Sequence, residues 1–290
     1  ENCMTAMPSG TDALSDIGII VEGSYPYVSG GVASWLQQLI QKLPEHTFDL
    51  ILLLARPQDP KNRKYEIPPN VKNITEIYLH QGIEKPLILP RECRDKNLIT
   101  DMIQQSFTLK HLHAVKLPDS DLEQKSRKTS LLYAHETFDI YCRWYREQGI
   151  DDHAFLDYFW QMRSLSMSLF NLITAQIKPC RVFHSLSTGY AGLLLARLLR
   201  DYPRSGRMVT EHGIYTRERS MEIMMTHWPN QDLQEQRVEK AVSFYADLWQ
   251  RIFRDMATVC YESCDRILSL FERNNQIQIS QGANPDITSY

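Results

Sequence analysis

The hydrophobic pattern at the start of the chain alternates between short apolar runs and helical periodicity. Residues 16–22 are rich in β-branched side chains, which is typical of a strand buried on both faces of a parallel sheet. A loop with glycines, 23–31, leads into a segment over 32–43 whose apolar positions follow helical spacing. Two further strands are predicted over 48–54 and 71–79. This order predicts the beginning of an open α/β sheet.

The alternation is interrupted in the middle of the chain. The interval from 81 to about 128 lacks a β-α rhythm, and a helix predicted over 97–115 has only a broken apolar stripe. Two helices are predicted next, over 130–148 and 152–176, and an aromatic stripe on the second favours core packing over a ligand platform. The stripe comprises Phe155, Tyr158, Phe159, Met162 and Leu165. We interpret residues 81–176 as a helical insertion.

The alternation returns after residue 180. Strands are predicted over 181–185, 207–210 and 266–270, a loop over 211–219, and helices over 190–200, 220–228, 233–262 and 272–280. This pattern predicts an α/β fold with a doubly wound, Rossmann-like parallel sheet. We expect residues 1–15 to be a flexible N-terminal segment and 16–282 to be the Rossmann-like domain. Residues 283–290 are expected to begin a linker.

Composition excludes several classes of protein. Hydrophobic residues make up 43% and charged residues 23% of the chain, as in a soluble globular protein with a substantial core. The 32 basic and 35 acidic residues give a formal charge of −3 and no field that would attract nucleic acid. No run approaches the roughly 18 apolar residues of a membrane span, and the N-terminus lacks a secretory signal. We therefore expect a cytoplasmic protein with no nucleic-acid partner and no direct membrane insertion.

The six cysteines show neither a CxxC pair nor a disulfide framework. Cys260 and Cys264 lie four residues apart on a predicted helix, which could place two metal ligands on one face. No histidine or acid nearby completes a tetrahedral set, so we expect reduced thiols and no metal site.

Ligands of open α/β sheets bind beyond the carboxyl ends of the strands, so the segments that follow strands are the candidates for a site. Gly30 and Gly31 precede a predicted helix, where they would admit a ligand close to the backbone and direct free amides at an anion such as a diphosphate. The segment lacks the GxGxxG spacing of a dinucleotide fold and the lysine of a P-loop. A tight turn without a ligand explains the glycine pair equally well.

A second candidate segment follows the strand predicted over 181–185. His184, Ser187 and Thr188 could bind sugar hydroxyls there. Alternatively, His184 orders the loop and one of the two hydroxyls caps the next helix.

A third candidate segment, 210–219, gathers two acids, two arginines, a histidine and a tyrosine. Arg217 and Arg219 could contact a phosphate or an acidic sugar, while Glu211 and His212 could hold hydroxyls or transfer protons. The alternative is a network of arginines and glutamates that only makes the loop rigid.

Four motifs carry a resemblance to a known family. They are EGSYPYVSGGVASW at 22–35, YFW at 158–160, HSLSTGYAG at 184–192 and TEHGIYTRER at 210–219. Together they resemble the PelF-like glycosyltransferases of bacterial Pel exopolysaccharide biosynthesis, in glycosyltransferase family GT4. The resemblance spans about residues 16–286. It implies the N-terminal, acceptor-side half of a GT-B fold and a retaining transfer from a UDP-sugar, usually UDP-glucose.

The resemblance also implies roles for individual residues. His212 matches the histidine beside the transferred sugar, and Gly30 and Gly31 match the loop on the donor diphosphate. The cleft that binds substrate would contain Tyr27, His184, Ser187, Thr188, Glu211, Tyr215 and Arg217. The implied ligands are a UDP-sugar donor and a glycan acceptor, with no cofactor and no metal. Membrane-bound Pel proteins are the implied protein partners.

The chain departs from the family pattern in two places. A stretch that usually reads Leu-Tyr-Glu-x-Asn-Arg is here LFERNN at 270–275, so a basic residue is absent. The sequence also ends where the family continues into a second Rossmann-like domain, which carries the nucleotide pocket. We therefore expect this polypeptide alone to bind UDP-sugar weakly and to transfer nothing. A different hypothesis is a non-catalytic module that binds the growing glycan or docks onto the membrane-bound machinery.

Overall fold

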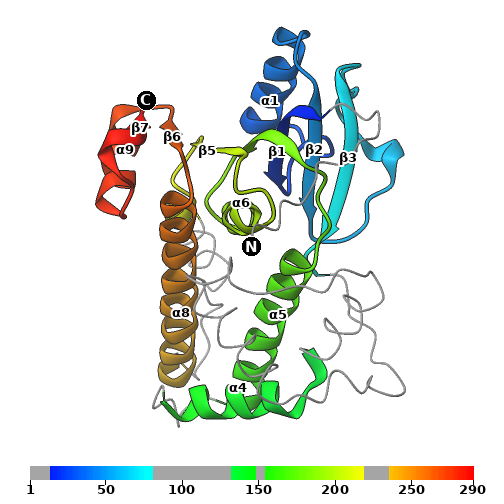
Figure 1. Ribbon diagram of the computed structural model, residues 1–290. Helices are drawn as coiled ribbons and strands as arrows, with labels where there is room; N and C mark the ends of the chain where they lie inside the picture. The colour runs from blue at the N-terminus through cyan, green and yellow to red at the C-terminus, as the bar shows by residue number, and fades with distance from the viewer. Residues whose placement is uncertain (1–13, 81–131, 148–153, 219–234) are drawn as a thin grey trace, which may run out of the picture.

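The computed structural model describes residues 14–80, 132–147, 154–218 and 235–290, with only the backbone described over 235–243. In these ranges seven strands form one parallel sheet in the order β3-β2-β1-β4-β5-β6-β7 (Figure 1). The strands are β1 (Ser15–Glu22), β2 (Phe48–Leu54), β3 (Val71–Tyr78), β4 (Cys180–Ser185), β5 (Gly206–Glu211), β6 (Arg266–Ser269) and β7 (Thr288–Ser289). The predicted doubly wound, Rossmann-like fold is therefore confirmed, and it is consistent with one half of a GT-B protein.

The helices agree with most of the predicted ones. They are α1 (Gly31–Lys42), α4 (His135–Glu147), α5 (Phe155–Ile173), α6 (Tyr190–Asp201), α8 (Glu235–Glu262) and α9 (Glu272–Ser280), with short 3-10 turns η1 (Pro60–Asn62) and η4 (Pro285–Ile287). The helices predicted over 97–115 and 220–228, and the predicted N-terminal segment up to residue 13, lie outside the described residues.

Both faces of the sheet are covered because side chains alternate along each strand. On β2, Leu50, Leu52 and Leu54 pack in one buried cluster with α1, while Ile51 and Leu53 belong to a second cluster with α5, α6 and α8. All seven residues of β2 are buried, including the polar Asp49, because the strand is covered on both faces. Since α1 and α6 cover opposite faces, the chain changes face between β1 and β4, which are neighbours in the sheet.

The described end of the predicted insertion is helical. Tyr158, Met162 and Leu165 on α5 are buried, and the two phenylalanines of the same stripe are half-buried against them, which confirms that this aromatic stripe is core. Figure 1 shows α5 and α8 extending together from the sheet, with α4 lying across their far end. The indole N–H of Trp249 on α8 donates to Oε1 of Gln161 on α5 at 3.2 Å.

A buried arginine closes the C-terminal end of α5. Arg197 on α6 is 3% exposed, and its Nη1 donates to the carbonyl oxygens of Leu172 at 2.8 Å and Ala175 at 2.5 Å. Its Nη2 pairs with the carboxylate of Asp201. The last carbonyls of a helix have no partner within the helix, so this guanidinium supplies the missing donors.

Replacement of Arg197 by methionine is expected to lower the free energy of unfolding by about 2 kcal/mol, since it leaves buried carbonyls without donors. Urea unfolding followed by circular dichroism measures the change. Arg204→Met is the control, because Arg204 is exposed and follows α6, the helix that contains Arg197. This variant should unfold like the wild type. Equal stability of the two variants would contradict the capping role of Arg197.

The structure corrects two predicted boundaries. Glu211 was expected in a loop but is the last residue of β5, paired with Ser269 of β6, and residues 215–218 are already helical. Residues 283–290 were expected to begin a linker, yet they contain η4 and β7, and Thr288 pairs with Ile267. A strand of two residues is too short to show an alternating pattern, so its sheet partner, rather than its own sequence, identifies it.

Candidate functional site

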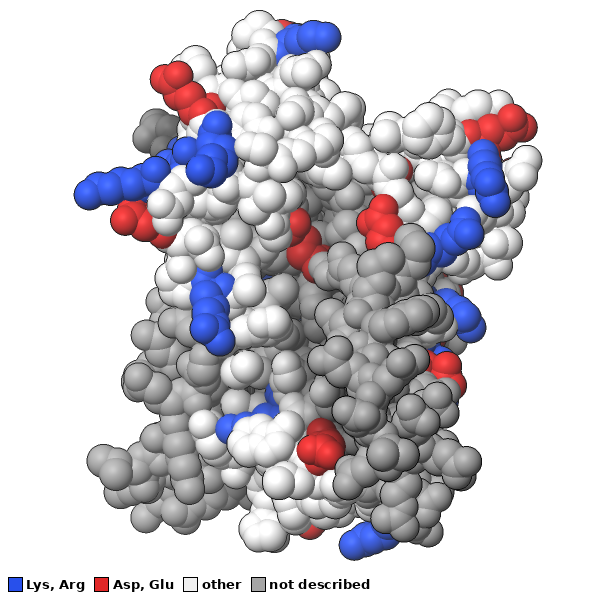
Figure 2. All heavy atoms as spheres, turned by 180° about the vertical axis from the view of Figure 1, so that it is seen from behind, with Lys and Arg blue, Asp and Glu red and all other residues white. Residues whose placement is uncertain are grey.

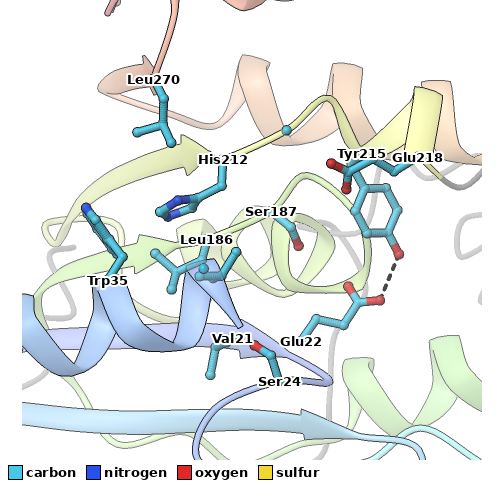
Figure 3. A pocket seen from close by; sticks show the side chains of 13 residues that line it. Val21, Glu22, Ser24, Trp35, Leu186, Ser187, His212, Tyr215, Glu218 and Leu270 are labelled. Atoms are coloured by element: carbon cyan, nitrogen blue, oxygen red, sulfur yellow. Dashed lines mark hydrogen bonds between the residues drawn. The ribbon is translucent and has the colours of Figure 1, made fainter. Parts of the chain in front are cut away.

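A cavity of about 630 Å³ opens at the carboxyl ends of β1, β4, β5 and β6 (Figure 3). It lies where the chain changes face between β1 and β4, the place at which open α/β sheets bind their ligands. Its described lining consists of Val21, Glu22, Ser24, Gly31, Val32, Trp35, Leu186, Ser187, His212, Gly213, Tyr215, Glu218 and Leu270. The cavity therefore joins parts of all three segments that the sequence singled out.

The N-terminal end of α1 forms one wall of the cavity. Gly31 is in the lining, and Gly30 precedes it as the N-cap in an extended conformation that any residue can adopt. A Cβ atom at either glycine would have no heavy atom within 4 Å, so the glycines leave open space above the helix start. The first turn of α1 contains no acidic residue, and helix N-termini attract anions.

His212 lies in the cavity and contacts Trp35. The two rings meet edge to face with centroids 4.6 Å apart. Burial lowers the pKa of the imidazole, so the neutral form prevails at pH 7. Nε2 of His212 is buried and has no hydrogen-bond partner within the described part of the chain. A polar atom left in this condition can bond to a ligand that enters the cavity.

His184, a predicted cleft residue, lies below the cavity and not in its lining. It is 6% exposed, and its Nε2 shares a hydrogen bond of 2.8 Å with Oγ1 of Thr210. Burial, and secondarily the nearby His212, lower the pKa of His184 to about 4. The placement agrees with the alternative in which this histidine orders the loop.

The two hydroxyl residues that follow β4 have different surroundings. Ser187 lines the cavity, and its Oγ is buried without a partner among the described residues. Thr188 is fully buried, and its hydroxyl donates to Oε1 of Glu211 at 2.9 Å. The start of α6 has no side-chain cap, so the part of the alternative in which one of these hydroxyls caps the helix is wrong.

Glu211 is a buried junction between elements, and it does not line the cavity. Its Oε2 accepts hydrogen bonds from the hydroxyl of Tyr261 at 2.6 Å and from Nε2 of Gln278 at 2.9 Å. Its Oε1 accepts from Thr188 at 2.9 Å and from the backbone N–H of Tyr215 at 3.4 Å. Desolvation raises the pKa of this carboxyl. Glu211 thus joins α8, α9 and the loop after β4 directly behind His212.

Tyr215 bridges the cavity from the residues after β5 to the end of β1. Its hydroxyl donates to Oε1 of Glu22 at 2.7 Å, which Figure 3 marks with a dashed line. A Cβ atom at position 189 would overlap the ring of Tyr215, so only glycine at that position allows the ring to lie there. Gly189 and Tyr215 are distant in the sequence, so only the tertiary structure shows that they lie in contact.

Two predicted cleft residues lie away from the cavity. Tyr27 packs in the cluster under α1, and its hydroxyl donates to Oε1 of Glu76 at 2.8 Å. Arg217 is exposed and is not in the lining. Arg219 lies outside the described residues. In place of Arg217, its neighbour Glu218 faces the cavity, because residues 215–218 are helical and successive side chains point in different directions.

Several lining residues were missed as site residues. Glu22 ends β1, and Leu270 comes directly after β6, so the rule that ligands bind beyond strand ends could have identified both. Trp35 follows Gly31 by four residues on α1, which places both on one side of the helix. Glu218 lay in a motif of interest, but its direction depends on a helix start that the sequence did not reveal.

The cysteines in the described part of the chain form neither a disulfide nor a metal site. Cys180, Cys260 and Cys264 are buried and free, as expected. Over the described ranges, no group of histidine, cysteine and acidic residues could hold a metal ion. No helix among the described residues is long and apolar enough to cross a bilayer.

Comparison with known protein families gives a match over most of the chain. The model of a family described as a domain of unknown function, DUF3492, matches residues 15–286. No curated protein matches the chain. The matched region includes every strand of the sheet except β7 and the whole described lining of the cavity.

Proposed function

The chain belongs to the DUF3492 family, and we propose that it is the N-terminal, acceptor-side half of a retaining GT-B glycosyltransferase that uses a UDP-sugar. The donor in this proposal is UDP-glucose, the acceptor is a glycan, and the product is a Pel-type exopolysaccharide. The DUF3492 family is associated with glycosyltransferase-like proteins, which supports the proposed class of reaction.

The main observation behind the proposal is that Gly31 and His212 line the same cavity. This cavity lies between β1 and β4, where the chain passes from one face of the sheet to the other. Free amides at the start of α1 would bind the donor diphosphate. The neutral imidazole of His212, whose Nε2 is buried without a partner in the described ranges, would hydrogen-bond to the transferred sugar. The carboxylates of Glu22 and Glu218 would accept hydrogen bonds from sugar hydroxyls.

Binding of UDP-glucose to this chain tests the proposal, with Gly31→Leu as the variant. Because position 31 adjoins open space, a leucine there fills the cavity without straining the backbone. We expect isothermal titration calorimetry to show weak binding to the wild type and binding at least about tenfold weaker to Gly31→Leu. Ser29→Leu, at an exposed position outside the lining, should bind like the wild type. Equal binding to all three proteins, or no binding at all, would contradict the proposal.

The second hypothesis, a non-catalytic module that binds glycan, is favoured by one feature. Trp35, Leu186 and Leu270 form an apolar side of the cavity on which a sugar ring could stack. The two hypotheses differ in UDP-sugar binding. Glycan binding that is unaffected by UDP-glucose and by Gly31→Leu would favour the module.

A further inference from the structure

The two sides of the cavity differ in chemistry. Figure 3 shows Trp35, Leu186 and Leu270 with His212 on one side, and Glu22, Ser187, Tyr215 and Glu218 on the other. We call the second group the acidic side. The start of α1 lies next to the apolar side, since Gly31 and Trp35 belong to the same helix.

The charged groups of the acidic side are all negative. Glu22 and Glu218 are in the lining, whereas the described lining includes no lysine and no arginine. His212 adds no positive charge at pH 7, because burial lowers its pKa. Figure 2 shows the same character on the surface: the charged atoms at the base of the notch between the two upper lobes are acidic.

The two carboxylates reach the cavity from different elements. The hydroxyl of Tyr215 donates to Oε1 of Glu22 at 2.7 Å and so fixes the side chain at the end of β1. The carboxylate of Glu218 lies over Gly213, where a Cβ atom would overlap it. The acidic side therefore combines one carboxylate fixed by a hydrogen bond, a second packed over a glycine, and the Oγ of Ser187, which is buried without a partner among the described residues.

We infer that the acidic side is an acceptor subsite that selects uncharged sugar residues and rejects anionic ones, such as uronic acids. This inference rests on the proposed function and adds the chemical class of the acceptor. Carboxylates accept hydrogen bonds from pairs of sugar hydroxyls, which favours a neutral sugar. A uronic acid would bring a third carboxylate next to Glu22 and Glu218, and like charges repel one another.

The inference also separates donor and acceptor within the cavity. The anionic diphosphate of the donor binds at the start of α1, where the first turn carries no acid. The acceptor then lies toward Glu22 and Glu218, on the opposite side. His212 lies beside Trp35 of α1 on the apolar side in Figure 3, and so belongs to the donor region of the cavity.

A pair of matched probes tests this selection. Saturation-transfer NMR titrations of the chain with methyl β-glucoside and with methyl β-glucuronide compare sugars that differ in one carboxylate. Two like charges about 6 Å apart in a partly buried site repel strongly enough to weaken binding by roughly tenfold or more. We expect the wild type to bind the glucoside at least about tenfold more tightly than the glucuronide.

Two variants assign the effect to the acidic side. Glu218→Gln and Glu22→Gln keep the shape and the hydrogen-bonding oxygen, so each should reduce the preference to about threefold or less while still binding the glucoside. Glu262→Gln removes an exposed charge at the end of α8, outside the lining, and is the control that should keep the full preference.

The inference is overturned if the glucuronide binds as tightly as the glucoside, if both cavity variants keep the full preference, or if neither sugar binds. UDP-glucose binding in the same samples reports separately on the proposed function. Retained UDP-glucose binding without sugar selection overturns only the acceptor class, whereas loss of both overturns the proposed function as well.

Discussion

Replacement of His212 by alanine is expected to lower transfer from UDP-glucose by at least about 100-fold in the two-domain glycosyltransferase that we propose. The imidazole lies in the cavity beside Trp35, and its Nε2 is buried without a partner in the described part of the chain. A side chain that bonds to the reacting sugar stabilises the transition state, so the loss appears in kcat. Release of UDP and transfer of radiolabelled glucose to a glycan acceptor measure it.

The pH dependence follows from the direction of the pKa shift. Burial lowers the pKa of His212 below its ordinary value of 6.5, so the neutral imidazole prevails at pH 7 and becomes protonated at a lower pH than an ordinary histidine. Activity that needs neutral His212 is lost only below the lowered pKa. We therefore expect wild-type kcat to stay level between pH 8 and 7, and to fall at a lower pH than the protonation of an ordinary histidine would cause.

His46→Ala is the matched control for His212→Ala. His46 is half-exposed and precedes β2, at the edge of the sheet opposite the cavity. Its replacement should leave both kcat and the pH profile unchanged. Full activity of His212→Ala would remove this histidine from the reaction, and loss of activity in both variants would indicate damage to the fold.

Replacement of Glu211 by leucine is expected to lower the free energy of unfolding by about 3 kcal/mol. The change leaves the hydroxyls of Tyr261 and Thr188, the amide of Gln278 and the N–H of Tyr215 without their acceptor. Unpaired buried donors are costly, and removal of the desolvated carboxylate offsets part of the loss. Urea unfolding at pH 7 measures the change.

Glu211→Gln removes the negative charge but keeps one oxygen that can accept hydrogen bonds, so it distinguishes these two contributions to stability. Its single amide oxygen can accept from only some of the four donors, so we expect a loss of about 1 kcal/mol. Glu262→Leu, at an exposed position, should be neutral. Equal stability of Glu211→Leu and the wild type would show that the network does not hold these elements together.

The acid side of the stability curve gives a second check on Glu211. Because desolvation raises the pKa of the buried carboxyl, the folded state binds this proton more tightly than the unfolded chain. Its titration therefore stabilises the fold below the ordinary pKa of 4.5, and this contribution is lost as the pH rises through the raised pKa. Glu211→Gln has no carboxyl at this position, so its free energy of unfolding should lack this dependence on pH. The difference in free energy of unfolding between the variant and the wild type should therefore shift in favour of the variant as the pH rises to 7.

The strand-end rule located much of the cavity before the structure did. Gly31, Ser187, His212 and Tyr215, all named from the sequence, line the same space because parallel strands end at one edge of the sheet. The chemical division of the cavity was not foreseen. Glu22 and Glu218 were passed over in favour of Arg217, although the structure leaves Arg217 outside the lining.

Local periodicity by itself determined the parallel sheet, its helices and the edge at which a ligand would bind. Apolar runs and helical spacing are properties of neighbouring residues, so the apolar run of β1 and the stripe of α1 could be predicted directly. Only the tertiary structure decided which polar residues face the cavity. His184, Thr188 and Glu211 are bonded to partners that include Thr210 and Tyr261, and Gly189 gives space to the ring of Tyr215. The bond to Thr210 comes from the adjacent strand β5. The other contacts depend on how loops and helices pack over the sheet, and the spacing of residues along the sequence does not determine that packing.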